Sequence, residues 1–264
     1  MRHLEAIIIL FIVLVGCKED TALVQTFNDN FDYHNSIWET YQVTDSSRFI
    51  LTPEPTNFNN NCLKFSLFPN DFHAGNKRNE FVLLTNDSIG RVVEYSFKFM
   101  FPRSFFEKEK KVDWIMIHQW HDEPPKGISW KNYQENTKPP IALYVSTSPD
   151  GRHKIVYNYG LESNNFQEKK HFIYKRYIRP NVWYTFSNTI KWSFNKNDGY
   201  SIPRINEEYL TSKGPYKASL IEGNNMYNEV SNYFKIGLYG YKKHQDTLFI
   251  YIDDFKYTLK ESNP

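Results

Sequence analysis

Three short segments combine side chains that bind anions with side chains that transfer protons. The three pairs are Arg78 with Glu80, Gln119 with His121, and Lys235 with Tyr239. Successive side chains of an extended strand point to opposite faces, so the members of each pair share a face. Arginine, lysine and glutamine donate hydrogen bonds to anions, whereas histidine and tyrosine can also exchange protons with a bound molecule. Each pair alone is more typical of a cross-strand ion pair or a satisfied polar contact.

The stretch from 232 to 243 predicts a strand with two unlike faces. Phe234, Ile236 and Leu238 form an apolar face that we expect to point into the core. The opposite face carries Tyr233, Lys235, Gly237, Tyr239, Tyr241 and Lys243. Tyrosines and lysines around a glycine that clears space suggest the floor of a cleft for an anionic, ring-shaped ligand. An amphipathic strand with solvated tyrosines and lysines explains the pattern equally well.

The rest of the chain predicts an all-β fold. Short strand-like runs alternate with clusters of Asn, Pro, Asp and Gly, and aromatic residues make up 17% of the sequence. The expected strands are 63–68, 77–84, 92–101, 112–120, 141–145, 154–159, 183–192 and 248–257. This pattern favours a β-jelly roll, a concanavalin-like sandwich of two sheets with a concave cleft. The long loop from Asp122 to Pro140 is expected to form a rim or lid of that cleft.

The first residues indicate export rather than fold. Arg2 and His3 precede a short apolar run, and Leu14-Val15-Gly16-Cys17 resembles a bacterial lipobox whose cysteine is lipidated. We therefore expect a signal peptide over 1–16, a lipidated N-terminus and tether over 17–27, and one domain over 28–264. An uncleaved membrane anchor is the alternative, but the apolar run is short for a membrane span. Cys17-Lys18-Glu19-Asp20 resembles the export tag of surface lipoproteins. This resemblance implies a protein anchored in the outer membrane and exposed on the cell surface.

The three pairs, in this order, resemble the signature strands of the β-jelly-roll polysaccharide lyases. The third signature, Tyr-Phe-Lys-x-Gly-x-Tyr, is matched by residues 233–239, and the likeness extends from about 28 to 257. The context around Gln119 and His121 is similar to the heparin lyase I-like and glucuronan lyase-like branch. Phe81 and Val82 follow the first signature where alginate lyases usually have Leu-Arg. Tyr241 also stands where they usually have Gln, so alginate is the less favoured substrate.

The resemblance implies β-elimination in a 4-linked uronic-acid polymer, which leaves an unsaturated uronate end. Arg78 and Gln119 would neutralise the uronate carboxylate so that the weakly acidic C5 proton can leave. His121, with an ordinary pKa near ~6.5, or Tyr239, near ~10, would be the base, and Tyr239 would protonate the departing O4. Lys235 is the expected cation beside Tyr239, where it would lower the tyrosine pKa. Glu80 is expected to orient Arg78, while Tyr233, Tyr241 and Lys243 would contact substrate.

The composition and the residue pattern also bear on other functions and ligands. The main alternative is a non-catalytic, surface carbohydrate-binding lipoprotein, which would need aromatic residues but no acid or base. A net charge of +2 gives no reason to expect nucleic acid as a partner, and we expect a monomer. The chemistry requires no cofactor, although Asp253 and Asp254 could bind a structural Ca²⁺ with Asn28 or Asp29. His118 and Trp120 are expected in the core, as is Cys62. Glucuronan, heparin-type chains and alginate remain open as substrates, as does endo or exo action.

Overall fold

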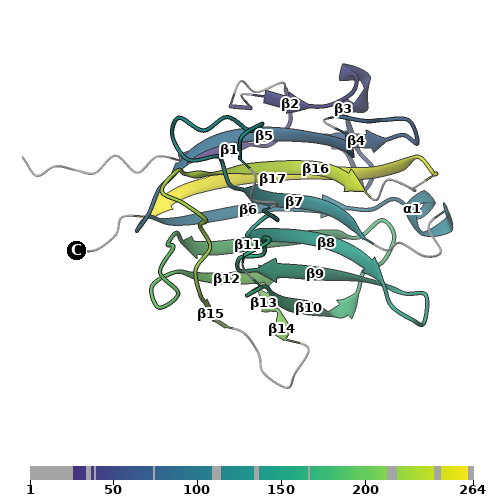
Figure 1. The fold of residues 1–264 in the computed structure, drawn as a ribbon. Coiled ribbons are helices and arrows are strands. Elements are labelled where there is room, and N and C mark those ends of the chain that lie inside the picture. Colours follow the sequence, from purple (N-terminus) through teal and green to yellow (C-terminus); the bar gives the residue numbers. More distant parts are fainter. Residues whose placement is uncertain are drawn as a thin grey trace, which may run out of the picture.

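The computed structural model describes residues 26–33, 37–38, 40–73, 75–108, 114–133, 137–165, 167–212, 219–240 and 245–260. Within these ranges the chain forms two antiparallel sheets packed face to face (Figure 1). The architecture is the predicted β-jelly roll. No helix among the described residues is long and apolar enough to cross a membrane.

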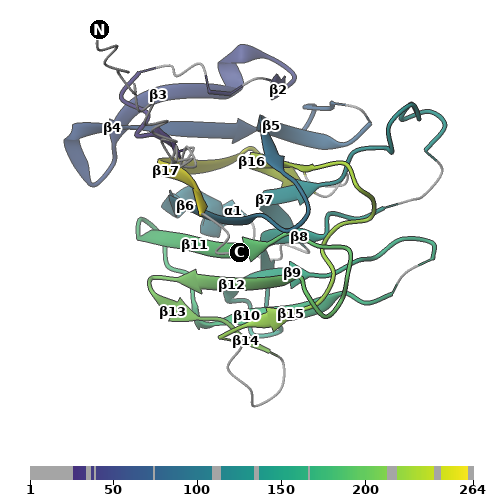
Figure 2. The same cartoon turned by 90° about the vertical axis from the view of Figure 1, so that its left-hand side faces the viewer.

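The first sheet has nine strands in the described part of the chain. Its main path is β13 (Glu208–Tyr209), β12 (Tyr200–Ile205), β11 (Trp183–Lys191), β6 (Val92–Met100), β17 (Leu248–Lys260), β4 (Asn57–Leu67) and β3 (Phe49–Glu54). Two short strands join this path, β1 (Thr26–Asp29) beside β17 and β15 (Ile221–Glu222) beside β12. Figure 2 shows β4, β17, β6, β11 and β12 following one another across this layer.

The second sheet has eight strands within the same described ranges and carries the predicted signatures. Their order is β14 (Thr211–Ser212), β10 (Lys170–Tyr177), β9 (His153–Tyr159), β8 (Ile141–Thr147), β7 (Ile115–His121), β16 (Asn232–Gly240), β5 (Lys77–Asp87) and β2 (Thr40–Gln42). β16 lies between β5 and β7, although its sequence is more than a hundred residues from either (Figure 1). The three signature segments are therefore hydrogen-bonded neighbours.

The core lies between the two sheets and is rich in aromatic side chains. In β6 the alternate residues Tyr95, Phe97 and Phe99 are fully buried, as the sequence pattern predicts. Tyr95 stacks on Phe234 of β16, with ring centroids 5.1 Å apart and planes 5° from parallel. Each large side chain buried this way contributes about 1.5–3 kcal/mol relative to exposure. This packing holds the back of β16 against the other sheet and leaves its opposite face for the site.

Two features differ from the sequence-based expectation. The tether was expected to run through residue 27, but β1 begins at Thr26 and pairs with β17, and the Phe27 ring lies 5.4 Å from that of Tyr257. Because of this pairing and ring contact, the folded domain includes the two residues before its expected start at residue 28. A short helix, α1 (Arg103–Lys108), follows β6, and a 3-10 turn, η1 (Ser46–Arg48), precedes β3. Phe105 of α1 is buried against Phe101, and this contact packs the short helix α1 onto the core of the domain.

Candidate active site

The register between β16 and its neighbours sets the positions of the signature residues. Tyr239 is opposite Arg78 on β5 and Met116 on β7, while Lys235 is opposite Gln119. Gly237 is opposite Glu80. All these strands present alternate side chains to the face that points away from the core. The structure therefore brings Arg78, Glu80, Gln119, Lys235 and Tyr239 together on one face.

Arg78 lies at the centre of this group. Its guanidinium carbon is 4.5 Å from the centre of the Tyr239 ring, and its Nη1 donates to Oε1 of Gln42 at 2.9 Å. Nη1 is also 3.9 Å from Oε2 of Glu80. The Nε–H of Arg78 is buried and has no hydrogen-bond partner among the described residues. A half-buried cation with a buried, unsatisfied donor is suited to bind an anionic group beside Tyr239.

Glu80 connects Arg78 to Gln119. Nε2 of Gln119 donates to Oε1 of Glu80 at 2.6 Å, and both side chains are buried. Oε2 of Glu80 and Oε1 of Gln119 have no hydrogen-bond partner in the described part of the chain. This arrangement agrees with the interpretation that Glu80 orients neighbouring groups, because its carboxylate contacts both.

Lys235 is buried on the same face, but it does not lie beside Tyr239 as expected. Its Nζ is 5.0 Å from the Tyr233 ring, and burial lowers its pKa to about 8, while the Glu80 carboxylate opposes that change. The cation beside Tyr239 is Arg78. Burial raises the pKa of Tyr239, and the Arg78 charge only partly offsets that rise. The expected lowering of the tyrosine pKa by Lys235 is therefore wrong for the free protein.

His121 lies at the last position of β7, opposite Tyr233. Its ring is 5.9 Å from that of Tyr233 and 6.0 Å from that of Trp130, which belongs to the long loop after β7. The residues between His121 and Tyr239 along the sheet are Gln119, Lys235 and Gly237. His121 and Tyr239 thus lie at opposite ends of the group, and the strand register does not place them opposite each other.

Gly237 is required by the backbone of β16. Its φ is +146°, and an added Cβ would lie 2.3 Å from the carbonyl oxygen of Asn79 on β5. The glycine therefore allows β16 to approach β5 between Lys235 and Tyr239. The sequence-based idea that it clears space for a ligand is replaced by this close backbone contact.

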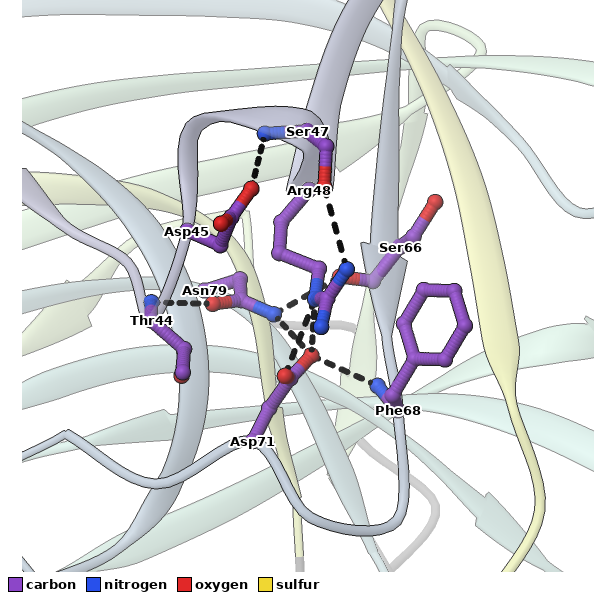
Figure 3. Close-up of polar contacts among 8 residues, drawn as sticks. All are labelled: Thr44, Asp45, Ser47, Arg48, Ser66, Phe68, Asp71 and Asn79. Carbon is purple, nitrogen blue, oxygen red and sulfur yellow. Dashed lines mark hydrogen bonds and ion pairs between the residues drawn. The ribbon is translucent and has the colours of Figure 1, made fainter.

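A polar cluster on the opposite face of β5 holds that strand in place (Figure 3). Asn79, between Arg78 and Glu80, donates to Oδ2 of Asp71 and to the carbonyl of Ser66, both at 2.8 Å, and accepts from the backbone N–H of Thr44 at 3.0 Å. The buried Asp71 carboxylate also accepts from Nε of Arg48 at 2.9 Å. These bonds fix β5 and the chain entering from β2, where Gln42 contacts Arg78.

A cavity of about 740 Å³ continues the site from Tyr239 across the second sheet. Its lining includes Trp114 and Tyr144 together with three lysines, Lys138, Lys154 and Lys169. Nζ of Lys169 is 3.3 Å from the Glu162 carboxylate, and its side chain is only 7% exposed. The cavity thus has an excess of positive groups and offers room for further units of a ligand bound at Arg78 and Tyr239.

Several predicted residues lie outside this group. Cys17, Tyr241 and Lys243 lie outside the described residues. His118 and Trp120 are fully buried, as expected, and burial lowers the pKa of His118 to about 3. Cys62 is also buried.

The acidic residues considered for calcium have other partners. Asp253 accepts from Nδ2 of Asn60 at 3.1 Å, and Asp29 accepts from Nε1 of Trp38 at 2.8 Å. The carboxylate of Asp254 pairs with the ammonium of Lys98. Among the described residues no group of three or more His, Cys, Asp or Glu side chains could hold a metal ion. Calcium at Asp253 and Asp254 stays a prediction.

Sequence reasoning missed three residues of the site: Gln42, Asp122 and Trp130. Gln42 is on the edge strand β2, which is three residues long and gives no periodic signal. The sequence marks Asp122 only as the start of a loop and Trp130 only as a part of that loop. The one available signal was the length of that loop, which suggested a role at the cleft.

Comparisons with known structures agree with the fold. The structure is similar to an endo-β-1,4-glucuronan lyase from the fungus Trichoderma reesei, with a TM-score of 0.63, 13% identity and coverage of 89% of this chain and 95% of that chain. An alginate lyase from Aplysia kurodai gives a TM-score of 0.52, 10% identity and coverage of 84% and 92%. A family 7 alginate lyase crystallised with substrate gives a TM-score of 0.52 and 11% identity, with coverage of 83% of this chain and 84% of that chain. At these identities the likeness shows the fold alone.

No curated protein sequence matches the chain. A family model described as polysaccharide lyase does match, over residues 34–256, which is most of the sequence and includes all three signature segments. The chain belongs to the polysaccharide lyase family.

Proposed function

We propose that this polysaccharide lyase cleaves a 4-linked uronic-acid-containing polymer by β-elimination. The observation that carries the proposal is the group around Arg78, where a half-buried cation with a buried, unsatisfied Nε–H lies against Tyr239. A uronate carboxylate placed there would be neutralised by Arg78 and by the second N–H of the Gln119 amide. Neutralisation makes the adjacent C5–H more acidic, which is the first requirement of the reaction.

The remaining steps need a base at C5 and an acid at O4. Burial raises the pKa of Tyr239, so this phenol holds its proton at neutral pH and is suited to donate it to the departing O4. His121 can then accept the C5 proton, and the C5–H electron pair forms the C4=C5 double bond. The opposite assignment, with Tyr239 as both base and acid, would need a further cation to lower its pKa.

Glucuronan is the first polymer to test. The lysines of the cavity support a substrate with negative charge on sugars beyond the cleaved one. One of the similar structures is a glucuronan lyase, and others are alginate lyases, so both polymers belong in the panel. Heparin, heparan sulfate, ulvan, pectate and hyaluronan complete it. Substrates with a single, isolated acidic sugar would leave most of the cavity's charge unused.

The test is the ultraviolet absorbance of the unsaturated uronate, followed with each polymer. We expect a rise with at least one polymer, and loss of nearly all turnover in His121→Ala and Tyr239→Phe, which stay folded. Tyr251→Phe, on β17 in the other sheet, is the matched control and should retain the wild-type rate. Wild-type rates in both site variants would refute the assignment of these residues. Retarded migration in glycan gels without any absorbance rise would favour the binding lipoprotein instead.

We also propose that the enzyme is anchored through a lipid on Cys17 at the outer membrane, facing outward. The support is the lipobox-like sequence ending at Cys17 and the acidic residues after it. Expression of Cys17→Ala with labelled fatty acid tests this, because the label should follow the wild-type protein and be absent from the variant. Equal labelling of both would contradict the anchor.

A further inference from the structure

Asp122 directly follows His121 and is buried, with only 1% of its surface exposed. Its Oδ2 accepts a hydrogen bond of 2.8 Å from the hydroxyl of Tyr133. Its Oδ1 is 3.0 Å from Nδ1 of His121 and has no hydrogen bond among the described residues. A buried carboxylate is costly unless neighbouring groups compensate its charge. Its direct partners in the described part of the chain are the ring of His121 and the hydroxyl of Tyr133, and the ammonium of buried Lys235 is close enough to interact with its charge.

The contacts of the His121 ring define which nitrogen carries the proton. Nδ1 lies 3.0 Å from the backbone carbonyl oxygen of Asp122, with hydrogen-bond geometry, and 3.0 Å from Oδ1 of the same residue. Both oxygens are acceptors only, so Nδ1 must be the donor in the neutral ring. The N–H points to the carbonyl, and Oδ1 acts on the ring through its charge. Nε2 is then left with its lone pair, as a proton acceptor requires.

We propose that Asp122 is a positioning residue that holds His121 in the Nδ1–H form and stabilises the imidazolium formed during the reaction. This inference rests on the proposed elimination. In the step concerned, the C5–H bond breaks and Nε2 of His121 takes the proton. The electron pair forms C4=C5 while the C4–O4 bond breaks, and O4 receives the Tyr239 proton. The imidazolium then has the Asp122 carboxylate 3.0 Å from Nδ1.

Tyr133 connects this arrangement to the long loop after β7. Its hydroxyl holds the second oxygen of Asp122, and its ring lies 6.1 Å from that of Trp130, which in turn is 6.0 Å from the His121 ring. Docking of the loop and orientation of the histidine are therefore coupled through one carboxylate. Tyr133→Phe removes only the hydroxyl and is a milder perturbation of the same contact than a change at Asp122.

The experiment compares Asp122→Asn and Tyr133→Phe with the wild-type enzyme. The matched control is Asp198→Asn, a half-exposed carboxylate paired with Lys191 in the other sheet. We expect kcat of Asp122→Asn to fall at least about tenfold with KM changed less than about twofold, because the lost interaction acts in the transition state. Tyr133→Phe should lower kcat by a smaller factor, and the control should leave it unchanged. Melting curves confirm that the variants fold.

Nitrogen chemical shifts of the labelled His121 ring, assigned with His121→Gln, supply a second readout that does not depend on substrate. The wild type should show Nδ1 protonated and Nε2 bare, and Asp122→Asn should show a mixture of tautomers, since an amide can donate to Nδ1. A wild-type ring protonated at Nε2, or folded variants with unchanged kcat, would overturn the positioning role. Absence of unsaturated product from any polymer would refute the proposed elimination instead, while the ring shifts would still report the tautomer.

Discussion

Replacing Lys235 by methionine should make the protein more stable. Lys235 is 2% exposed, and burial lowers its pKa from 10.5 to about 8. Each whole step of pKa corresponds to about 1.4 kcal/mol, so holding this ammonium in the fold at neutral pH costs about 3 kcal/mol relative to water. Methionine has a similar length and carries no charge to desolvate. The free energy of unfolding of Lys235→Met should therefore exceed that of the wild type by up to about 3 kcal/mol at pH 7.

The pH dependence gives this prediction a second signature. The pKa of Lys235 is lower in the folded than in the unfolded protein, so between about pH 8 and 10.5 the folded state binds fewer protons. The wild type must then gain stability from this group as the pH rises through that window. The advantage of Lys235→Met should shrink over the same range and be lost near pH 10.5.

Urea unfolding of both proteins at a series of pH values measures the difference directly. Lys256→Met, which removes an exposed lysine of β17, is the control and should change stability little at any pH. A Lys235→Met protein less stable than the wild type at pH 7 would refute the reasoning. A stability difference that stays constant from pH 7 to pH 10.5 would also refute it, because the cost would then not be that of the charge.

Three further changes test other parts of the site. Tyr239→Phe should lower kcat by at least about a hundredfold without loss of stability, because the phenol is the proposed acid; an unchanged pre-steady-state rate would contradict that role. Gly237→Ala should destabilise the protein by about 1–3 kcal/mol in urea unfolding, because the alanine Cβ would meet the Asn79 carbonyl; equal midpoints would show that the two strands separate easily. Lys169→Met should raise KM about threefold or more with little change in kcat, since the lysine lines the cavity away from Arg78. If KM at low salt were the same in the variant and the wild type, the cavity would not be part of the substrate-binding site.

The strands of the core were predictable because their signal is local. Alternating residues such as Tyr95 and Phe97 define a buried face without knowledge of the neighbouring strands. The sequence Ser148-Pro149-Asp150-Gly151 is typical of a hairpin turn, and the Gly151 N–H donates to the Ser148 carbonyl at 2.9 Å between β8 and β9. Strand β12 was missed because Pro203 interrupts its pattern, although the proline occupies a position opposite Asn188.

That Arg78, Glu80, Gln119, Lys235 and Tyr239 share one face was predictable from the alternation of the signature strands, but the contacts among them were not. Which residue lies beside Tyr239 depends on the register between β5 and β16, which are separated by more than a hundred residues. That register places Arg78, rather than Lys235, against the tyrosine ring. The partner of His121 was hidden for a different reason, because Asp122 follows the strand and has no periodic pattern to mark it as buried.

The central claim is that the face around Arg78 and Tyr239 performs an elimination. The most direct measurement is the mass of the oligosaccharides released from glucuronan and from the other polymers of the panel. Elimination consumes no water, unlike hydrolysis. Each new non-reducing end should therefore be lighter by one water than a saturated end and should carry the C4=C5 absorbance. Products with the mass of saturated oligosaccharides and without that absorbance would mean hydrolysis, and would contradict this account of the site.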